Sequence, residues 1–244
     1  MRAIFTYHSI DDSGSPISVA RQDFRAQVRW LKAEGVAVVS LPVLVGLGDE
    51  SDAVALTFDD GVASFMTEAV PILEVEGMTA TVFVVSGQVG GSNTWTSPGR
   101  HSVPTLPLLD WDELGWLRAS GFEIGSHTRH HRWLPRCDDG ELVEEIERAG
   151  DEFASALGVR PRVFAYPYGA HTDRVASAVA RSHDLACTTE FRALHPGERA
   201  LLLPRIDAYY LRGRALRRGW GTPGFCRFLA VRRALRAVGN FRPW

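Results

Sequence analysis

The sequence of 244 residues is poor in cysteine and has no long hydrophobic run. Its three cysteines, an odd number without paired spacing, exclude a small disulfide-stapled scaffold and favour reduced thiols that act as packing residues. No apolar run reaches the roughly 18 residues that a membrane-spanning helix needs. The first residues also lack the apolar segment and cleavage site of a signal peptide, so we expect a cytoplasmic protein.

What the chain does contain is typical of a globular protein with one sizeable core. It has 45% hydrophobic and 23% charged residues and a mean hydropathy of -0.08, which excludes wholesale disorder and a collagen-like chain. The length permits two domains, but an α/β barrel commonly uses about 250 residues as one unit. No internal repeat or linker divides residues 1–207, which we interpret as one domain.

Charge is distributed unevenly along the chain. The 27 basic and 29 acidic residues give a net charge of -2, yet residues 208–244 hold nine arginines and no acid. Residues 1–207 therefore carry a net charge of -11. An acidic body argues against nucleic-acid binding. We treat residues 208–244 as a basic, helical C-terminal extension.

Two interpretations of this extension stay open. Its apolar residues recur with helical periodicity among the arginines. In the interpretation we favour, the helix covers the bottom of the barrel and pairs with the acidic body. In the alternative, a basic amphipathic helix contacts an anionic membrane at its inner face. The residues concerned are Phe225, Phe228, Leu229, Ala234, Leu235 and Val238, with Arg227, Arg232, Arg233 and Arg236 among them.

Short apolar runs alternate with amphipathic stretches, which predicts a parallel sheet with crossover helices. Helices are expected near 20–34, 65–76, 110–120 and 138–157, the last two opened by the capping-box pairs Asp110/Glu113 and Asp138/Glu141. The predicted strands are Arg2–Tyr7, Val36–Ser40, Ala53–Phe58, Thr79–Val85, Phe122–Ser126, Val163–Ala165, Leu185–Thr188 and Leu201–Leu203.

Polar clusters follow four of these strands. In parallel α/β folds, reactive groups lie on the loops after the carboxyl ends of the strands, so we expect the four clusters to share one rim. A buried strand that ends in two carboxylates is costly unless the charges meet a cation. The clusters are His8, the pair Asp59 and Asp60, the group His127, His130 and His131, and the segment Tyr166–Gly169.

Each cluster alone has an ordinary explanation. An Asp-Asp-Gly sequence is often a turn and helix cap, histidines four apart often lie on a solvated helix face, and Pro-Tyr-Gly is usually a turn. Coincidence at four strand ends is harder to accept. Two imidazoles and one carboxylate with an open position form a common catalytic metal arrangement, and an adjacent carboxylate is a natural base.

Three motifs occur in a recognisable order: Thr57–Gly61, His127–His131 followed by Leu134, and Phe164–Gly169. With them, the sequence resembles the polysaccharide deacetylase family, also called the NodB homology domain or carbohydrate esterase family four. The segments Tyr7–Ile10 and Leu203–Ile206 resemble the branch associated with exopolysaccharide and surface-glycan modification. The resemblance covers roughly residues 1–207.

The resemblance implies a fold and a metal site. The fold would be a NodB-like, distorted (β/α) barrel of about seven strands. Asp60, His127 and His131 would hold a divalent metal, usually zinc. His130 lies between the ligand positions and is expected to be a neighbour, because on a helical turn it would point about 100° away from His131.

The resemblance also implies an activity, the removal of an acetyl group from an N-acetylated amino sugar in a glycan or glycan precursor. Asp59 would act as the base, and the backbone N–H of Tyr168 would stabilise the oxyanion. Trp95, in the Gly- and Ser-rich connection 86–107, would either stack on a sugar ring or anchor its loop. Tyr166 and Pro167 are further expected substrate contacts.

Two positions depart from the family pattern. Ala165 stands where many members carry an arginine that orients the catalytic aspartate, and Arg162 or Arg205 would have to replace it. The family's general-acid histidine after the last leucine-rich strand is also missing. His8 is our preferred substitute because the first strand should neighbour the last, and His195 is the weaker candidate.

Other functions stay open at this point. The same metal chemistry would serve an O-acetyl esterase or a cyclic-amide hydrolase. The missing arginine and histidine would suit a degenerate glycan-binding protein, although such a protein has little reason to keep a base, three ligands and an oxyanion loop. The identity of the sugar and the oligomeric state are not predicted.

Overall fold

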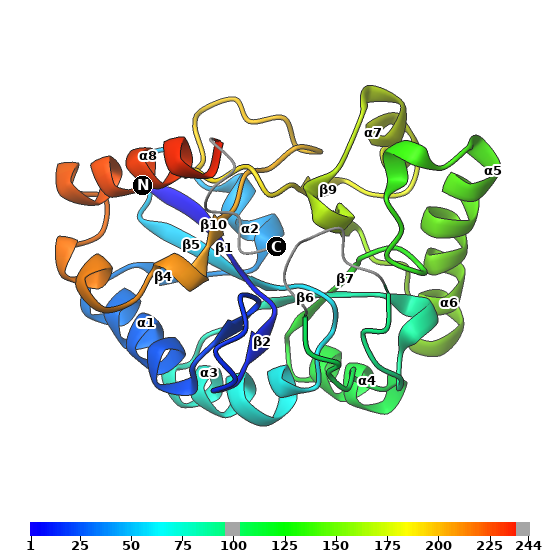
Figure 1. Ribbon diagram of the computed structural model, residues 1–244, viewed down its shortest axis with the longest axis horizontal. Helices are drawn as coiled ribbons and strands as arrows, with labels where there is room; N and C mark the ends of the chain where they lie inside the picture. Colours follow the sequence, from blue (N-terminus) through cyan, green and yellow to red (C-terminus); the bar gives the residue numbers. More distant parts are fainter. Residues whose placement is uncertain (96–102, 238–244) are drawn as a thin grey trace.

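A curled parallel sheet forms the centre of the molecule, whose computed structural model describes residues 1–95 and 103–237. The strands follow the order β10-β1-β5-β6-β7-β8-β9, and the short β4 pairs with β5 (Figure 1). This arrangement confirms the predicted distorted (β/α) barrel. The strands are β1 (Arg2–Tyr7), β4 (Ala37–Val38), β5 (Ala53–Phe58), β6 (Thr81–Val84), β7 (Glu123–Ser126), β8 (Val163–Ala165), β9 (Leu185–Cys187) and β10 (Ile206–Asp207), with a separate pair β2 (Ser9–Ile10) and β3 (Ser18–Val19).

Helices surround the sheet, and both predicted capping boxes are present, at Asp110/Glu113 and at Asp138/Glu141. No helix in residues 1–95 or 103–237 is long and apolar enough to cross a membrane. The helices are α1 (Arg21–Ala33), α2 (Leu41–Gly46), α3 (Val70–Glu76), α4 (Trp111–Ala119), α5 (Asp139–Leu142), α6 (Arg148–Leu157), α7 (Asp173–Val179) and α8 (Pro223–Ala237), with π-helical turns at Phe65–Ala69 and Val143–Glu147.

The strands are apolar on both faces because both faces are covered. On β1, Phe5 and Tyr7 belong to the large cluster that packs against the helices, whereas Ile4 packs with the smaller cluster that includes Phe83 of β6 and Cys187 of β9. Alternate residues of one strand therefore fill the two cores, and the carboxyl ends of the strands are left to carry polar groups.

The last strand lies later in the chain than predicted. Leu202 is part of a turn, with its N–H bonded to the carbonyl of Arg199, so an apolar run that resembles a strand is not one. Leu203 alone makes a parallel bridge, to Cys187 of β9, and Ile206 then pairs with Phe5 of β1. Residues 203–207 thus link the two edges of the curled sheet.

The C-terminal extension contacts the bottom of the barrel, where Nε1 of Trp220 donates to the carbonyl of Met1 at 3.2 Å, and then runs along its side. The Phe225 ring of α8 lies 5.6 Å from that of Trp30 on α1. At the far end of α8, Arg236 pairs with Asp207 at 3.0 Å, at the carboxyl end of β10. The contact with the acidic body is therefore present, but the division of the chain at residue 207 stays a prediction, and Val238 lies outside the described residues.

Candidate metal centre and active site

The predicted polar clusters meet at the carboxyl-end rim, the edge of the sheet where β1, β5, β7 and β8 end. The ring centroid of His131 lies 4.8 Å from that of His127 and 4.6 Å from that of Tyr168. His8 is close enough to Asp59 for the carboxylate to act on its pKa. Segments more than 100 residues apart in sequence are brought together here because parallel strands share one carboxyl edge.

Asp60, His127 and His131 form a buried cluster of potential metal ligands. One ligand atom from each lies within 4.8 Å of the other two. The Nε2 atoms of His127 and His131 are 3.5 and 3.4 Å from Oδ1 of Asp60. A ring of three donors of this size can close around a single ion with a small inward movement.

The hydrogen bonds around this cluster fit a cation. Nδ1 of His127 lies 2.7 Å from the carbonyl oxygen of Ala165, so Nδ1 carries the hydrogen and the lone pair of Nε2 faces Asp60. Oδ1 of Asp60 is buried and finds no hydrogen-bond donor in the described part of the chain. A lone pair directed at an unpartnered buried oxygen is costly unless a cation lies between them, and two imidazoles with one carboxylate suit a divalent metal.

The pKa values of the cluster point the same way. Burial, reinforced by the charge of Asp59, raises the pKa of Asp60 to about 8. Burial lowers the pKa of His127, and it lowers that of His131 well below the usual value. Without an ion the pocket therefore disfavours the carboxylate, which a bound cation would stabilise.

Asp59 is held by a buried arginine, the orienter that the sequence left undecided. Nη1 and Nη2 of Arg205 donate to Oδ1 and Oδ2 of Asp59 at 2.6 and 2.7 Å, and Nε donates to the carbonyl of Thr188 at 2.9 Å. Burial works to raise the pKa of Asp59, but Arg205 holds it well below its usual range. Arg162 instead pairs with Asp184 on the surface. Of the two candidates, Arg205 occupies the orienting position.

The site also concentrates backbone strain. Among the described residues other than glycine, only four have a positive φ, between 58° and 71°. Three of them are predicted site residues and the fourth lies in the same loop as two ligands. Such conformations cost on the order of 1–3 kcal/mol each and persist where surrounding contacts enforce them. The four are Asp60, Thr128, His131 and Tyr168.

Aromatic rings surround the cluster of potential metal ligands. The ring of Trp95 stacks on that of His131, with centroids 4.7 Å apart. Trp133 stacks on Tyr168 at 5.5 Å and is 40% exposed. Trp133 was not predicted as a site residue, although its place two residues after the histidine motif was an available signal. The role of Trp95 in substrate binding stays a prediction. Its ring contacts His131, one of the three potential metal ligands.

The two candidates for the general acid lie at opposite ends of the barrel. Burial lowers the pKa of His8 to about 4, while Asp59 acts in the opposite direction. His195 is exposed, and its neighbour Leu194 bonds through N–H to the carbonyl of Arg2, at the amino end of β1. His195 is therefore remote from the carboxyl-end rim, so the prediction that it could serve as the general acid is wrong.

Of the predicted substrate contacts Tyr166 and Pro167, Tyr166 has its hydroxyl turned into the core. Tyr166 is fully buried, and its hydroxyl donates to the carbonyl of Leu201 at 3.1 Å. Pro167 is also buried and accepts an N–H bond from Ala170, which closes the turn that carries Tyr168. The Tyr166 side chain therefore supports the loop from below, because an aromatic hydroxyl in a core needs a partner there, and the role of Pro167 as a substrate contact stays a prediction.

Glu145 was not predicted as a functional residue. It holds the loop 127–131, which carries the two histidine ligands. Its Oε2 accepts from the backbone N–H of His130 at 2.9 Å, and its Oε1 lies 2.8 Å from Nδ1 of the same ring. Its carbonyl accepts from the N–H of Arg129 at 3.0 Å. The side chain is only 1% exposed and lies in the π-helical turn Val143–Glu147, a feature frequent at functional sites. A glutamate in an amphipathic helix usually lies on the solvent-exposed face, so the sequence did not indicate that Glu145 is buried.

We expect Glu145→Leu to weaken metal binding about 10- to 100-fold, because outer contacts that hold ligand loops carry this much affinity. The metal affinity of Glu145→Gln should lie between those of Glu145→Leu and the wild type, since an amide oxygen still accepts one hydrogen bond. Isothermal titration of the metal-free protein measures both. Glu144→Gln, on an exposed neighbour, is the matched control, and wild-type affinity in Glu145→Leu would contradict the role.

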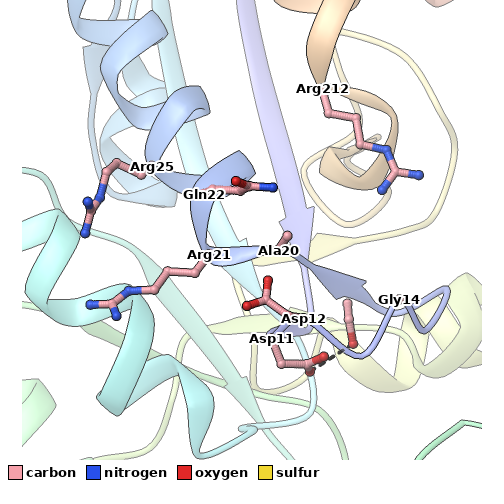
Figure 2. A pocket seen from close by; sticks show the side chains of 9 residues that line it. Asp11, Asp12, Gly14, Ala20, Arg21, Gln22, Arg25 and Arg212 are labelled. Atoms are coloured by element: carbon pink, nitrogen blue, oxygen red, sulfur yellow. Dashed lines mark hydrogen bonds between the residues drawn. The ribbon is translucent and has the colours of Figure 1, made fainter.

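A hollow lies where the loop between the parallel strands β2 and β3 meets the start of α1 (Figure 2). Its volume is about 630 Å³. Asp11 accepts from the N–H of Ser13 at 2.8 Å and from the hydroxyl of Ser18 at 2.9 Å, which fixes the loop between β2 and β3. Asp11 follows His8 by three residues, so this hollow lies towards the carboxyl end of β1. Asp12, Arg21, Arg25 and Arg212 also line it.

Known proteins resemble this chain in sequence and in fold. The polysaccharide deacetylase family profile matches residues 47–187, more than half of the chain. The YxkH protein of Bacillus subtilis is 24% identical over 193 residues, covering 77% of this chain. A poly-beta-1,6-N-acetyl-D-glucosamine N-deacetylase of Staphylococcus aureus is 21% identical over 200 residues, or 78% of this chain. The chain spans 64% and 67% of the lengths of these two relatives.

Solved structures agree on the fold. IcaB from Ammonifex degensii superposes with a TM-score of 0.74 at 24% identity, covering 95% of this chain and 97% of that one. The deacetylase PplD of Streptococcus pyogenes, in complex with acetate, gives a TM-score of 0.72 at 24% identity and covers 84% and 91% of the two chains. With the family profile matched across β5 to β9 and the same barrel around the rim, this chain belongs to the polysaccharide deacetylase family.

Proposed function

We propose that the protein is a metal-dependent hydrolase that removes the acetyl group from an N-acetylated amino sugar in a glycan or glycan precursor. The observation that carries the proposal is the buried Asp60–His127–His131 cluster beside Asp59, a second carboxylate oriented by Arg205. Support comes from the Staphylococcus aureus relative, whose name gives poly-beta-1,6-N-acetyl-D-glucosamine as its substrate.

We propose zinc as the ion, held by Asp60, His127 and His131. Two histidines and one carboxylate leave a coordination position open, as catalytic zinc sites do. A bound zinc ion would polarise the acetyl carbonyl and lower the pKa of a water molecule. The hydrogen bond from His127 to Ala165 keeps Nε2 unprotonated and directed at the ion's position.

The side chains around the cluster supply the remaining chemistry. Asp59, kept ionised by Arg205, takes the proton from the attacking water. The backbone N–H of Tyr168, in its strained turn, stabilises the negative charge that develops on the carbonyl oxygen. The departing amine needs a proton, and the one that Asp59 takes from water balances the reaction; His8, whose pKa burial lowers to about 4, is the candidate that relays it. Acetate and a free amino sugar leave.

The walls of the site suit a sugar chain. Trp95 beside the cluster presents an aromatic ring of the kind that stacks on sugar faces, as does Trp133. The hollow in Figure 2 begins at Asp11, three residues after His8, and its polar lining would hold a further residue of a polymeric substrate. A glycan longer than one sugar is therefore the substrate that the shape supports best.

The proposal is tested by loading the protein with zinc, cobalt or nickel and measuring acetate release from a panel of N-acetylated and O-acetylated glycans. We expect release from an N-acetylated substrate, and His127→Ala should lose both the metal and the activity. Release only from O-acetyl esters would make the protein an esterase. Glycan binding without any acetate release by the loaded protein would support the binding-protein alternative instead.

A further inference from the structure

The outward side of α8 differs from an ordinary solvated helix face. Phe225 and Leu229 point into the core, with 0% and 6% of their surfaces exposed. The opposite side, expected to be polar in a surface helix, exposes Cys226, Ala230, Val231 and Ala234. Val231 alone is 51% exposed. The outer side of the helix thus carries an apolar strip of small side chains, interrupted by Arg227, that no described residue covers.

Arginines stacked on aromatic rings lie on the other side of α8, where the helix packs against residues 209–218. The guanidinium of Arg232 lies 5.0 Å from the ring of Tyr210 and 5.8 Å from that of Phe228. Arg218 lies over the other side of the same cluster, 5.0 Å from Phe228. Arg212 lies 4.1 Å from the ring of Tyr209, which touches Tyr210. Stacking of this kind fixes guanidinium groups in place while their N–H edges stay available.

These positive charges are largely uncompensated. Within residues 208–237 there is no acidic residue, and only Arg233 and Arg236 of the described arginines reach carboxylates, those of Glu190 and Asp207. The remaining six arginines in this range form no ion pair within the described part of the chain. They are Arg212, Arg214, Arg217, Arg218, Arg227 and Arg232.

We propose that residues 212–218 and the outer side of α8 form a docking face for an anionic lipid bilayer. Exposed arginines around an apolar strip match a bilayer surface, where headgroup phosphates take the guanidinium groups and the strip enters the interface. A soluble polyanion would use the arginines but leave the strip exposed. α8 lies at the outer edge of the molecule (Figure 1), so the face can approach a flat surface.

The docking face adjoins the carboxyl-end rim. Arg212 belongs to the face and also lines the hollow at the start of α1 (Figure 2). A protein docked in this way would present its rim close to the headgroups. The proposal does not depend on the proposed deacetylase activity, because none of its contacts involves the metal cluster.

Co-sedimentation with vesicles tests the docking face in the full-length chain. We expect binding to vesicles that contain phosphatidylglycerol, weak binding to phosphatidylcholine alone, and loss of binding as salt rises. The triple change Arg214→Gln, Arg217→Gln and Arg227→Gln should lower the partition coefficient roughly 100-fold, at about fivefold per arginine. The matched control replaces three exposed arginines outside this face, Arg29, Arg118 and Arg136, and should bind like the wild type.

A second pair of variants tests the apolar strip. Val231→Asp should weaken vesicle binding, whereas Val75→Asp, at an 80% exposed valine on α3, should not. Equal binding of the triple variant and the wild type would overturn the proposal. Binding to dextran sulfate or DNA but not to vesicles would overturn it too, in favour of a polyanion site. Acetate release from a soluble substrate should be unchanged in the triple variant, which separates this test from that of the proposed function.

Discussion

Asp59→Asn should lower acetate release about 100- to 10,000-fold, the range that general acid–base catalysis contributes, while bound metal is retained. Asparagine keeps the shape of the side chain but cannot take a proton from water. The three ligands stay in place because Asp59 is not one of them. Turnover of an acetylated glycan and metal content by mass spectrometry give the two readouts.

The pattern across variants distinguishes a base from a ligand. His127→Ala should lose metal and activity together, whereas Asp59→Asn should lose activity alone. Asp112→Asn, at an exposed position on α4, controls for the substitution itself. Circular dichroism confirms that each variant is folded. Asp59→Asn with more than a tenth of wild-type turnover would remove the base from the mechanism.

Arg205→Met should destabilise the fold by about 3–5 kcal/mol, because it leaves Asp59 buried without its cation. Arg205 is 2% exposed and Asp59 is 3% exposed, so water cannot take over the pairing. Denaturant unfolding of the metal-free protein measures the loss. Arg162→Met is the matched control, since its partner Asp184 is exposed and such pairs contribute about 1 kcal/mol or less.

A double variant separates the charge effect from the loss of packing. Asp59→Asn combined with Arg205→Met removes both charges, so it should be more stable than Arg205→Met alone. An equal or larger loss in the double variant would mean that Arg205 stabilises the barrel mainly through its bonds to Thr188 and Thr57.

Local patterns in the sequence were sufficient for most of the sheet and for the metal cluster. The bounds predicted for β1, β5 and β8 match the structure because continuous apolar runs between turn residues leave little choice of where each strand begins and ends. The convergence of Asp60 with His127 and His131 follows from a rule of topology, since residues after parallel strands share an edge. The family motifs added the assignment of base and ligands.

Contacts between distant segments could not be predicted in the same way. Arg205 and Arg162 were equivalent as candidates, and only the folded chain shows which guanidinium reaches Asp59. Glu145 gave no signal, because its burial depends on how the π-helical turn is packed. The strand β10 is two residues long and follows a buried charge, so it has no periodicity to detect.

The closure of the sheet by residues 203–207 has a consequence for biosynthesis. Asp59 precedes Arg205 by 146 residues, so an emerging chain carries the acid long before its counter-ion has been translated. A nascent polypeptide cut at the end of the matched family region, residue 187, would lack both the strand that completes the cylinder and the only arginine bonded to that acid in the described structure. Because distant pairings form slowly, catalytic competence should arise in a single late event, after the ribosome has delivered the final strand.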